Sequence, residues 1–315
     1  MARARGAPGP AGDSVAAGRG ALAGGRGLCA ALAGRRPPSE PREKIFRPRP
    51  ASRFPRGQAG RPQPASPVMA SPNVIPRAII FDVYGTLLEV SAPPPDADAR
   101  WRRLFQEYFG AEPALSRVDF SLRTARIVAR QHAEAKARGI ARPEIQWPVV
   151  VAEAVPEFGR LEAGDQMRFQ IEQMRVGRSL RLADGAADCL RELAEDERIL
   201  GVASNSQAYT LHELGDALAA AGLGLDLFHP ELRFWSFAHG FSKPDPHVFS
   251  ILTARLEARG IAPGEILMVG DRLDNDVEPA RAHGWQSWHL LLRGPGSGSR
   301  SGNWRDLRAW LNRGG

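Results

Sequence analysis

Side chains that can carry out hydrolysis follow short apolar runs at several points in the chain. A carboxylate can act as a nucleophile, hydroxyl and amide groups can bind an anion, and clustered carboxylates can bind a metal ion. Most of these groups occur where an apolar run ends, which is the edge of a parallel sheet at which ligands bind. The residues selected on this ground are Asp82, Thr86, Ser204, Asn205, Lys243, Asp271, Asp274 and Asp276.

Asp82 directly follows the apolar run at residues 78–81. A run of this kind is typical of a strand buried on both faces, so the carboxylate after it is expected to face the crevice beyond the strand. Gly85 permits a sharp turn, and Thr86 places a hydroxyl in the same loop. These features predict that Asp82 is a nucleophile. Taken alone, they fit equally well with an aspartate that caps the next turn.

Ser204 and Asn205 follow a second apolar run, at residues 199–203. A hydroxyl, an amide and the free N–H groups at the start of a helix can together bind an anion. An ordinary helix cap uses the same residue types, and one residue can serve both purposes. The segment therefore predicts an anion site, a helix N-terminus, or both.

Lys243 lies in the segment 240–246, where two prolines restrict the backbone. A stiff loop fixes the direction of the lysine side chain, so the ammonium group can serve a site on a neighbouring strand. The alternative is an ordinary surface lysine.

Asp271, Asp274 and Asp276 follow a third apolar run, at residues 266–269. Two like charges about 4 Å apart, at an effective dielectric constant of 20, repel by roughly 4 kcal/mol, and a bound cation removes this cost. Oxygen ligands with spare positions for water suit Mg²⁺. The segment predicts a magnesium site, with an acidic loop in solvent as the alternative.

The apolar runs alternate with helical patterns. A fourth run lies at residues 288–292, and helical patterns cover residues 184–195 and 246–259. Pro246 suits the first position of the second helix, and Gly260 can end it. This alternation predicts the α/β class, with a doubly wound, Rossmann-like parallel sheet that carries helices on both faces.

Residues 92–182 interrupt the alternation with a stretch that is mostly helical in pattern, with apolar residues gathered in 101–109 and 167–180. A stretch of this length is too long for a simple connection, so it predicts an inserted helical domain. The insertion follows the first strand at its carboxyl end, where it would form a lid over the site. The core domain would then comprise residues 73–91 and 183–315.

Residues 1–72 differ from the rest in composition. They hold 13 Lys/Arg, 3 Asp/Glu, 12 of the 26 prolines and 11 of the 33 glycines, without apolar periodicity. Such a segment is expected to be disordered, because it cannot bury enough surface to offset its ordering entropy. It could be a targeting segment, a basic interaction arm, or an extension upstream of a true start at Met69.

The rest of the chain excludes several classes of protein. Residues 73–315 hold 29 basic and 32 acidic residues, so the overall charge of +7 belongs to the N-terminal segment and predicts no nucleic-acid partner. No apolar run is long enough to span a membrane. Cys29 and Cys189 are the only cysteines, which fits a reducing, cytoplasmic setting. The seven histidines show no zinc-ligand spacing.

The order of the four segments, Asp82, Ser204, Lys243 and Asp271, resembles that of the haloacid dehalogenase (HAD) superfamily across about residues 77–293. The resemblance implies a doubly wound core with an inserted helical cap, and a hydrolase that acts through a covalent aspartyl intermediate. It implies a small-molecule substrate, expected to be phosphorylated.

The resemblance also assigns roles within the site. Asp82 is then the nucleophile, Ser204 hydrogen-bonds the transferred group, and Lys243 neutralises charge on that group and on Asp82. Thr86 and Asn205 would help to bind the phosphate. Magnesium would be held by Asp82, Asp271, Asp276 and the backbone carbonyl of Tyr84.

Tyr84 departs from the phosphatase pattern, in which a second aspartate stands two residues after the nucleophile and serves as acid and base. A phenol is a poor base at neutral pH. Tyrosine at this position resembles the 2-haloacid dehalogenases, but those enzymes carry Ser and Asn where this chain has Asp271 and Leu273, and Tyr where it has Phe249.

Three functions therefore stay open. The chain could be a Mg²⁺-dependent phosphatase, as Asp271 and Asp276 favour. It could be a haloacid dehalogenase, as Tyr84 favours, with Arg102 or Arg103 binding the halide. It could also be a binding or regulatory protein that kept the site and lost turnover.

Overall fold

The computed structural model describes residues 74–294 and 300–313 of the chain. The predictions for residues 1–72, including the disorder, the start at Met69 and the setting of Cys29, lie outside the described residues.

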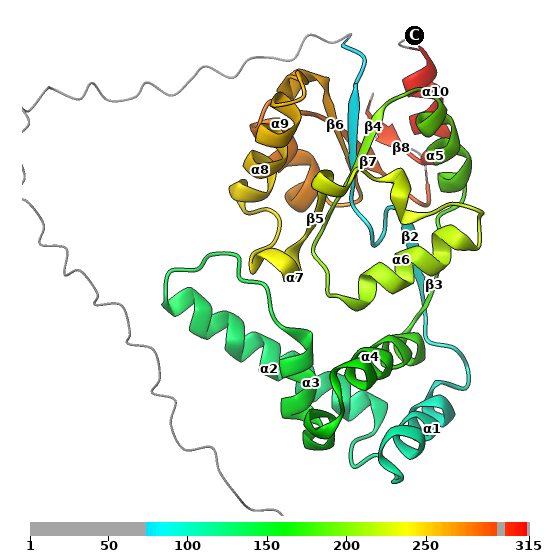
Figure 1. Ribbon diagram of the computed structural model, residues 1–315, viewed down its shortest axis with the longest axis vertical. Helices are drawn as coiled ribbons and strands as arrows, with labels where there is room; N and C mark the ends of the chain where they lie inside the picture. The colour runs from blue at the N-terminus through cyan, green and yellow to red at the C-terminus, as the bar shows by residue number, and fades with distance from the viewer. Residues whose placement is uncertain (1–73, 295–299, 314–315) are drawn as a thin grey trace, which may run out of the picture. The chain divides into compact units, whose positions relative to one another are not determined.

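A six-stranded parallel sheet forms the centre of the core, in the order β5-β4-β1-β6-β7-β8 (Figure 1). Every pair of neighbouring strands in it is parallel. The predicted α/β class with a doubly wound parallel sheet is confirmed. The strands are β1 (Ala78–Phe81), β4 (Ile199–Ser204), β5 (Arg233–Trp235), β6 (Ile266–Gly270), β7 (Gln286–Leu290) and β8 (Ser301–Gly302).

Helices cover both faces of this sheet, as Figure 1 shows. Ile79 and Phe81 of β1 point into one apolar cluster, and Ala78 and Ile80 point into another. Both faces of β1 are thus buried, which explains why its sequence is continuously apolar rather than alternating. The first cluster includes residues of α5 (Ala186–Glu195), α6 (Tyr209–Ala219) and α10 (Trp304–Arg313), and the second includes residues of α8 (Pro246–Glu257) and α9 (Glu278–Ala282).

Three of the four predicted apolar runs begin where strands β1, β4 and β6 begin, and β4 and β6 each extend one residue beyond their run. The fourth strand, β7, begins two residues before the predicted range of 288–292. It begins with the polar residues Gln286 and Ser287, which are both buried. Gln286 donates to the carbonyls of Val74 and Gly264, and Ser287 accepts from Arg281. Satisfied polar groups of this kind can lie inside a sheet, but they interrupt the apolar run.

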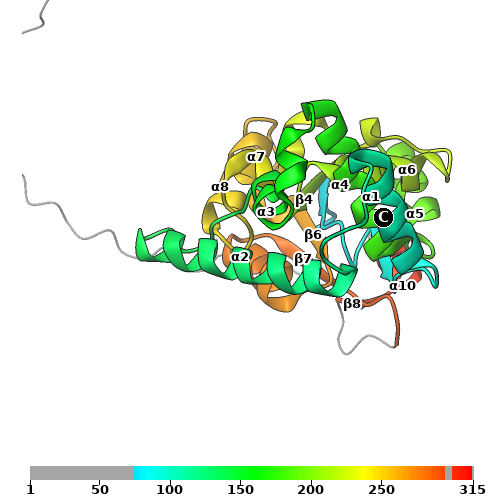
Figure 2. The ribbon, with the colours of Figure 1, turned by 90° about the horizontal axis from the view of Figure 1, so that it is seen from below.

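The helical segment, residues 92–182, has an apolar cluster of its own. Rings from several helices meet around Phe169, which contacts Phe105, Phe109 and Phe158. Figure 2, which views the chain from below, shows the long α2 running along one side of this segment, next to α3. Its helices are α1 (Ala97–Phe109), α2 (Arg117–Ala137), α3 (Trp147–Ala154) and α4 (Ala163–Gly177).

Residues 92–182 are mostly helical, as predicted, but the end of this segment is a strand. Helix α4 ends before Arg178, whose backbone is extended, and the chain continues as β3 (Ser179–Leu182). This strand pairs antiparallel with β2 (Leu88–Ser91) in a separate two-stranded sheet. β2 leads into the helical segment and β3 leads out of it.

Short turns complete the described structure. They are α7 (Ser236–His239), the 3-10 turns η1 (Pro156–Arg160), η2 (Leu225–Leu227), η3 (Pro230–Leu232) and η4 (Pro263–Glu265), and the π-helical turn η5 (Leu273–Val277).

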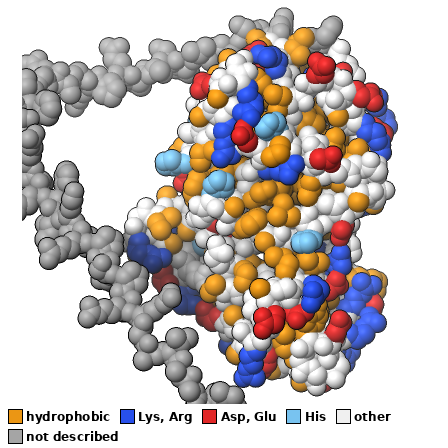
Figure 3. All heavy atoms as spheres, in the orientation of Figure 1, with side chains coloured by type: hydrophobic (Ala, Val, Ile, Leu, Met, Phe, Trp, Pro, Cys, Tyr) orange, Lys and Arg blue, Asp and Glu red, His pale blue; other side chains and the backbone are white. Residues whose placement is uncertain are grey.

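Basic and acidic side chains are interspersed on the face drawn in Figure 3. Within residues 74–294 and 300–313, no helix combines the length and apolar composition needed to cross a bilayer.

A substitution at Gly201 in β4 would test how tightly the sheet is packed. A Cβ atom at this position would lie 2.6 Å from Ile80 Cδ1 and 2.7 Å from the carbonyl oxygen of Leu232. We expect Gly201→Ala to lower the free energy of unfolding by about 1–3 kcal/mol, because the backbone of a packed core cannot yield freely. Denaturant unfolding measures this. Gly177→Ala is the control, since no heavy atom lies within 4 Å of its Cβ, and equal losses in the two variants would contradict the packing argument.

Candidate active site

Three of the predicted segments meet at one edge of the sheet. Asp82 follows β1, Ser204 ends β4, and Asp271 follows β6, and these three strands are neighbours. Because neighbouring parallel strands end at the same edge, their terminal side chains come together there. The backbone N–H of Asp82 donates to the carbonyl of Val269 at 2.9 Å, which joins the loop after β1 to the end of β6.

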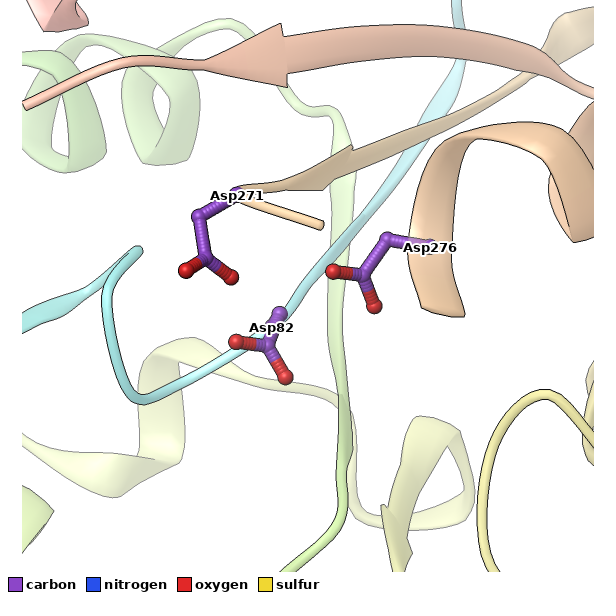
Figure 4. Close-up of side chains that lie close together, drawn as sticks. All are labelled: Asp82, Asp271 and Asp276. Atoms are coloured by element: carbon purple, nitrogen blue, oxygen red, sulfur yellow. The ribbon is translucent and has the colours of Figure 1, made fainter. Parts of the chain in front are cut away.

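Asp82, Asp271 and Asp276 form a carboxylate cluster, in which one oxygen from each lies within 4.8 Å of the others (Figure 4). Asp276 lies in η5, and its Oδ2 accepts from the backbone N–H of Arg272 at 3.2 Å. Asp274 does not join the cluster, because it is exposed and pairs with the Arg272 side chain. Two of the three carboxylates predicted in this loop therefore meet Asp82.

Two glycines allow the carboxylates to approach the backbone. Gly85 has a φ of +80°, and a Cβ atom there would lie 2.4 Å from Asp271 Oδ2. A Cβ atom at Gly270 would lie 2.4 Å from Asp276 Cγ. Any larger residue at either position would displace a carboxylate of the cluster.

The Lys243 ammonium group lies between two of the carboxylates. Its Nζ is 2.8 Å from Asp82 Oδ1 and 2.5 Å from Asp276 Oδ1, and the side chain is fully buried. Asn205 fixes the lysine backbone from both sides: its Nδ2 donates to the Lys243 carbonyl at 2.9 Å, and its Oδ1 accepts from the Lys243 N–H at 2.7 Å. The alternative of a surface lysine is wrong.

Burial and charge shift the pKa values of these groups. Burial raises the pKa of the Asp82 carboxyl to about 7, and Asp276 adds to this, although Lys243 opposes it. Burial also raises the pKa of Asp271. Burial acts to lower the pKa of Lys243, but Asp276 and Asp82 outweigh it and hold that pKa above its ordinary value. One ammonium group cannot neutralise three carboxylates, so the cluster favours a further cation or a proton.

Two of the predicted site residues have buried hydroxyls without partners. Ser204 Oγ and Thr86 Oγ1 make no hydrogen bond within the part of the chain that the structure describes. Buried polar groups are rarely unpaired, so these two hydroxyls mark a place where a bound group would accept hydrogen bonds. Asn205 differs, because its amide already serves Lys243; its binding of phosphate stays a prediction.

The Tyr84 side chain is directed at helix α6. Its hydroxyl donates to Glu213 and lies 2.7 Å from Thr210 Oγ1. Arg178 Nη2 donates to the same hydroxyl at 2.9 Å, and the Arg178 guanidinium lies 4.5 Å from the centre of the Tyr84 ring. Burial raises the pKa of the Tyr84 phenol above its ordinary value, although Arg178 opposes this. Tyr84 therefore stays protonated at neutral pH.

A family model described as haloacid dehalogenase-like hydrolase matches residues 76–284, which is more than half of the chain. The chain belongs to this family. No curated protein matches the sequence.

Several solved structures are similar to this HAD-like hydrolase. YfnB from Bacillus subtilis, a HAD hydrolase described as bound to magnesium, is 21% identical, with a TM-score of 0.44 over 75% of this chain and 99% of its own. A HAD phosphatase from Thermococcus onnurineus is 19% identical, with a TM-score of 0.44 over 74% and 97%. A 2-haloacid dehalogenase from Pseudomonas syringae pv. Tomato is 18% identical, with a TM-score of 0.47 over 76% and 99%.

The partners of Tyr84 were not predicted from the sequence of this HAD-like hydrolase. Arg178 lies directly after α4, and Glu213 and Thr210 lie in α6, about a hundred residues or more from Tyr84. Glu213 and Thr210 are buried, and the Arg178–Glu213 ion pair is 2.6 Å long. No local pattern marks polar residues that come together over such separations.

The two arginines suggested as halide ligands lie elsewhere. Arg102 and Arg103 are exposed on α1. A cavity that is lined by Tyr84, Asn205 and Ser206 includes neither arginine. The structure therefore does not bring these arginines to the predicted site residues.

The pKa of Asp82 predicts how stability depends on pH. In the range from about pH 4 to pH 7, the folded protein binds a proton at Asp82 that the unfolded chain has released, so the free energy of unfolding should fall as pH rises. Without divalent cations, Asp82→Asn should therefore raise the melting temperature more at pH 7.5 than at pH 5. We expect a gain of about 3 °C or more, which corresponds to about 1 kcal/mol in a domain of this size.

Thermal unfolding in EDTA at the two pH values measures this difference. Asp274→Asn is the control, since Asp274 is exposed and lies outside the cluster. Equal pH dependence in the wild-type protein and Asp82→Asn would show that Asp82 does not carry the effect.

Tyr84→Phe removes the hydroxyl that donates to the buried Glu213. We expect this to lower the free energy of unfolding by about 1–2 kcal/mol, because the carboxylate loses one of its donors. Denaturant unfolding measures the loss. Tyr209→Phe serves as control, since the Tyr209 hydroxyl makes no hydrogen bond to the other described residues. A loss no larger than the control's would contradict the structural role.

Proposed function

We propose that this HAD-like hydrolase is a Mg²⁺-dependent phosphatase that cleaves a small phosphate ester through an aspartyl intermediate at Asp82. The observation that carries the proposal is the carboxylate cluster of Asp82, Asp271 and Asp276 around the buried Lys243. This combination suits the transfer of a group that is itself strongly negative.

The donor set of the cluster fits magnesium. It offers oxygen atoms only, and Lys243 engages one oxygen each of Asp82 and Asp276. The other Asp82 oxygen and the Asp271 carboxylate stay available to a metal ion, while Asp276 Oδ2 also accepts from the Arg272 N–H. Asp82, Asp271 and Asp276 would hold the ion, with the Tyr84 carbonyl as the further ligand predicted from the family. When bound, Mg²⁺ would supply the positive charge that lets an anionic phosphate approach an anionic carboxylate.

The chain's own residues supply the other parts of the reaction. An ionised Asp82 carboxylate attacks phosphorus, and the bond from phosphorus to the ester oxygen breaks as the leaving group takes its electrons. Lys243 offsets the charge on Asp82 and on the phosphoryl group. Ser204 and Thr86 donate their unpaired hydroxyls to phosphoryl oxygens. Water then cleaves the aspartyl phosphate, which releases phosphate and restores Asp82.

Tyr84 restricts the leaving group. Its hydroxyl is bonded to Glu213 and its pKa is raised, so it neither accepts a proton from water nor readily gives one to an alkoxide. Turnover should therefore be faster with leaving groups that depart as stable anions, such as phenolates or carboxylates. If the lack of an acid and base at Tyr84 prevented turnover of every ester, the same site would belong to a protein that only binds phosphate.

A haloacid dehalogenase is the second candidate, and Tyr84 favours it. In the metal-free reaction, Asp82 would attack carbon and expel halide, and the Asp271 carboxylate would have no partner charge. Halide release from 2-chloropropionate at high enzyme concentration, without release of phosphate from any ester, would replace the proposal with this function.

Phosphate release from p-nitrophenyl phosphate by the full chain tests the proposal. We expect EDTA and Asp82→Asn each to reduce the rate by about a hundredfold or more, because each removes a charge or nucleophile that the transition state needs. Asp271→Asn should raise the Mg²⁺ concentration required for half of the maximal rate. The control Asp274→Asn should stay within about twofold of the wild-type rate.

The other outcomes discriminate among the alternatives. Phosphate release that EDTA leaves unchanged would contradict a metal-dependent phosphatase. Binding of phosphate or beryllium fluoride, with no turnover of any ester, would identify a binding protein instead. If the wild-type protein hydrolyses an ester and Asp82→Asn abolishes this activity, a pure binding protein is excluded.

A further inference from the structure

A cavity of about 390 Å³ lies where the helical segment meets the loops after β1 and β4. A volume of this size accommodates a small organic group. Residues from both parts of the chain line it, and those that bear on the argument are Tyr84, Asn205 and Ser206 from the core, and His132, Glu144 and Trp147 from the helical segment.

Glu144 is the acidic residue in this lining, and its position is fixed. Its Oε1 accepts from Gln207 Nε2 and from the N–H of Ile145, both at 2.9 Å, and its own N–H donates to the Gly240 carbonyl at 3.0 Å. Gln207 is buried, and its Oε1 accepts from the N–H of Trp147 at 3.0 Å. The Glu144 carboxylate is therefore held in place from several sides.

Backbone contacts also connect the segment around Glu144 to the loop that carries Lys243. Pro143 and Phe241 form an antiparallel β-bridge, and the N–H of Ser242 donates to the Arg142 carbonyl at 3.1 Å. The next residue is Lys243. Backbone pairing thus fixes the distance between the ammonium group at the carboxylate cluster and the carboxylate at the cavity wall.

The charge balance of the cavity wall is negative. Arg178 also lines the cavity, but its guanidinium pairs with the buried Glu213 and donates to Tyr84, so its charge is already offset. Glu144 Oε2 has no hydrogen-bond partner among the described residues. Trp147, Tyr209 and Tyr84 add aromatic surface, which can contact an apolar group or the face of an ammonium ion.

We propose that Glu144 determines substrate specificity, by selecting phosphate esters whose organic part is neutral or carries an amine. An ester with a carboxylate or a second phosphate at that end would meet the Glu144 charge without a free cation to balance it. This inference rests on the proposed function, because the phosphate of the same ester would occupy the carboxylate cluster.

Three esters of similar size separate the charge of the organic part from its shape: phosphoethanolamine, 2-hydroxyethyl phosphate and phosphoglycolate. Assays run at pH 8, where an ordinary imidazole group is mostly uncharged. We expect kcat/KM to be highest for phosphoethanolamine, lower for 2-hydroxyethyl phosphate and lowest for phosphoglycolate. The first and last should differ by roughly tenfold or more, as a charge inversion near a partly buried carboxylate predicts.

Variants of Glu144 identify the residue responsible. Glu144→Gln should reduce the preference for phosphoethanolamine over phosphoglycolate by roughly tenfold, and Glu144→Lys should reverse it. Glu157→Gln is the control, since it removes an exposed carboxylate of the helical segment that does not line the cavity, and it should leave the preference unchanged. Thermal unfolding of each variant shows whether it is folded.

Dissociation constants of the three esters, measured by calorimetry on the full chain, separate this inference from the proposed function. If neither these esters nor p-nitrophenyl phosphate is hydrolysed, but affinity follows the same order and responds to Glu144→Gln, the proposed function fails and the inference holds. If esters are hydrolysed but phosphoglycolate is preferred, or Glu144→Gln changes nothing, the inference is overturned and the function stands. If none of the three esters binds, the inference is overturned, and the p-nitrophenyl phosphate assay decides the proposed function.

Discussion

The buried ammonium group of Lys243 is the interaction on which the site depends. It lies within hydrogen-bond distance of Asp82 and Asp276, which come from loops almost two hundred residues apart in sequence. Burying Lys243, Asp82 and Asp276 costs free energy of hydration, and their ion pairs offset this cost only when the geometry is well fixed. The lysine offsets part of the negative charge of the cluster, but burial, together with the Asp276 charge, still raises the pKa of Asp82 to about 7. A cluster with this excess of negative charge lowers the stability of the fold, as is common at functional sites. A bound cation would remove the excess, so we expect a cation site at this edge of the sheet.

One short loop after β4 connects this ammonium group to the rest of the molecule. Ser204 has a buried hydroxyl without a partner among the described residues, Asn205 fixes the backbone of Lys243, and Gln207 holds the segment that contains Glu144. Residues within four positions of one another thus bear on the reacting group, on the lysine that balances its charge and on the wall of the cavity. Because all of them follow a single central strand, the distances between these parts are set by the backbone of the core rather than by flexible side chains.

The sequence predicted the parts of this arrangement that local rules determine. Asp82, Ser204 and Asp271 follow apolar runs, and parallel strands bring such residues to one edge regardless of their separation in sequence. It did not predict β2 and β3, because four-residue strands such as Ser179–Leu182 lack a continuous apolar run and are only partly buried. It also could not separate Asp274 from its neighbours, since the direction of a carboxylate in a π-helical turn depends on the backbone path through Arg272. The contacts of Tyr84 with Glu213 and Arg178 depend wholly on the packing of distant elements.

Those contacts change how the residue two positions after Asp82 should be understood. Tyr84 joins the loop after β1 to α6 through Glu213, and to the start of β3 through Arg178, where the chain leaves the helical segment. An aspartate at this position would have a shorter side chain, and any approach to Glu213 would bring two carboxylates together in a buried environment. Tyrosine avoids this repulsion because a neutral phenol donates to the carboxylate, and its ring lies against the guanidinium. Glu213 and Arg178 thus hold the phenol in place. The same hydrogen bonds that fix the loop after β1 also prevent Tyr84 from serving as an acid or a base.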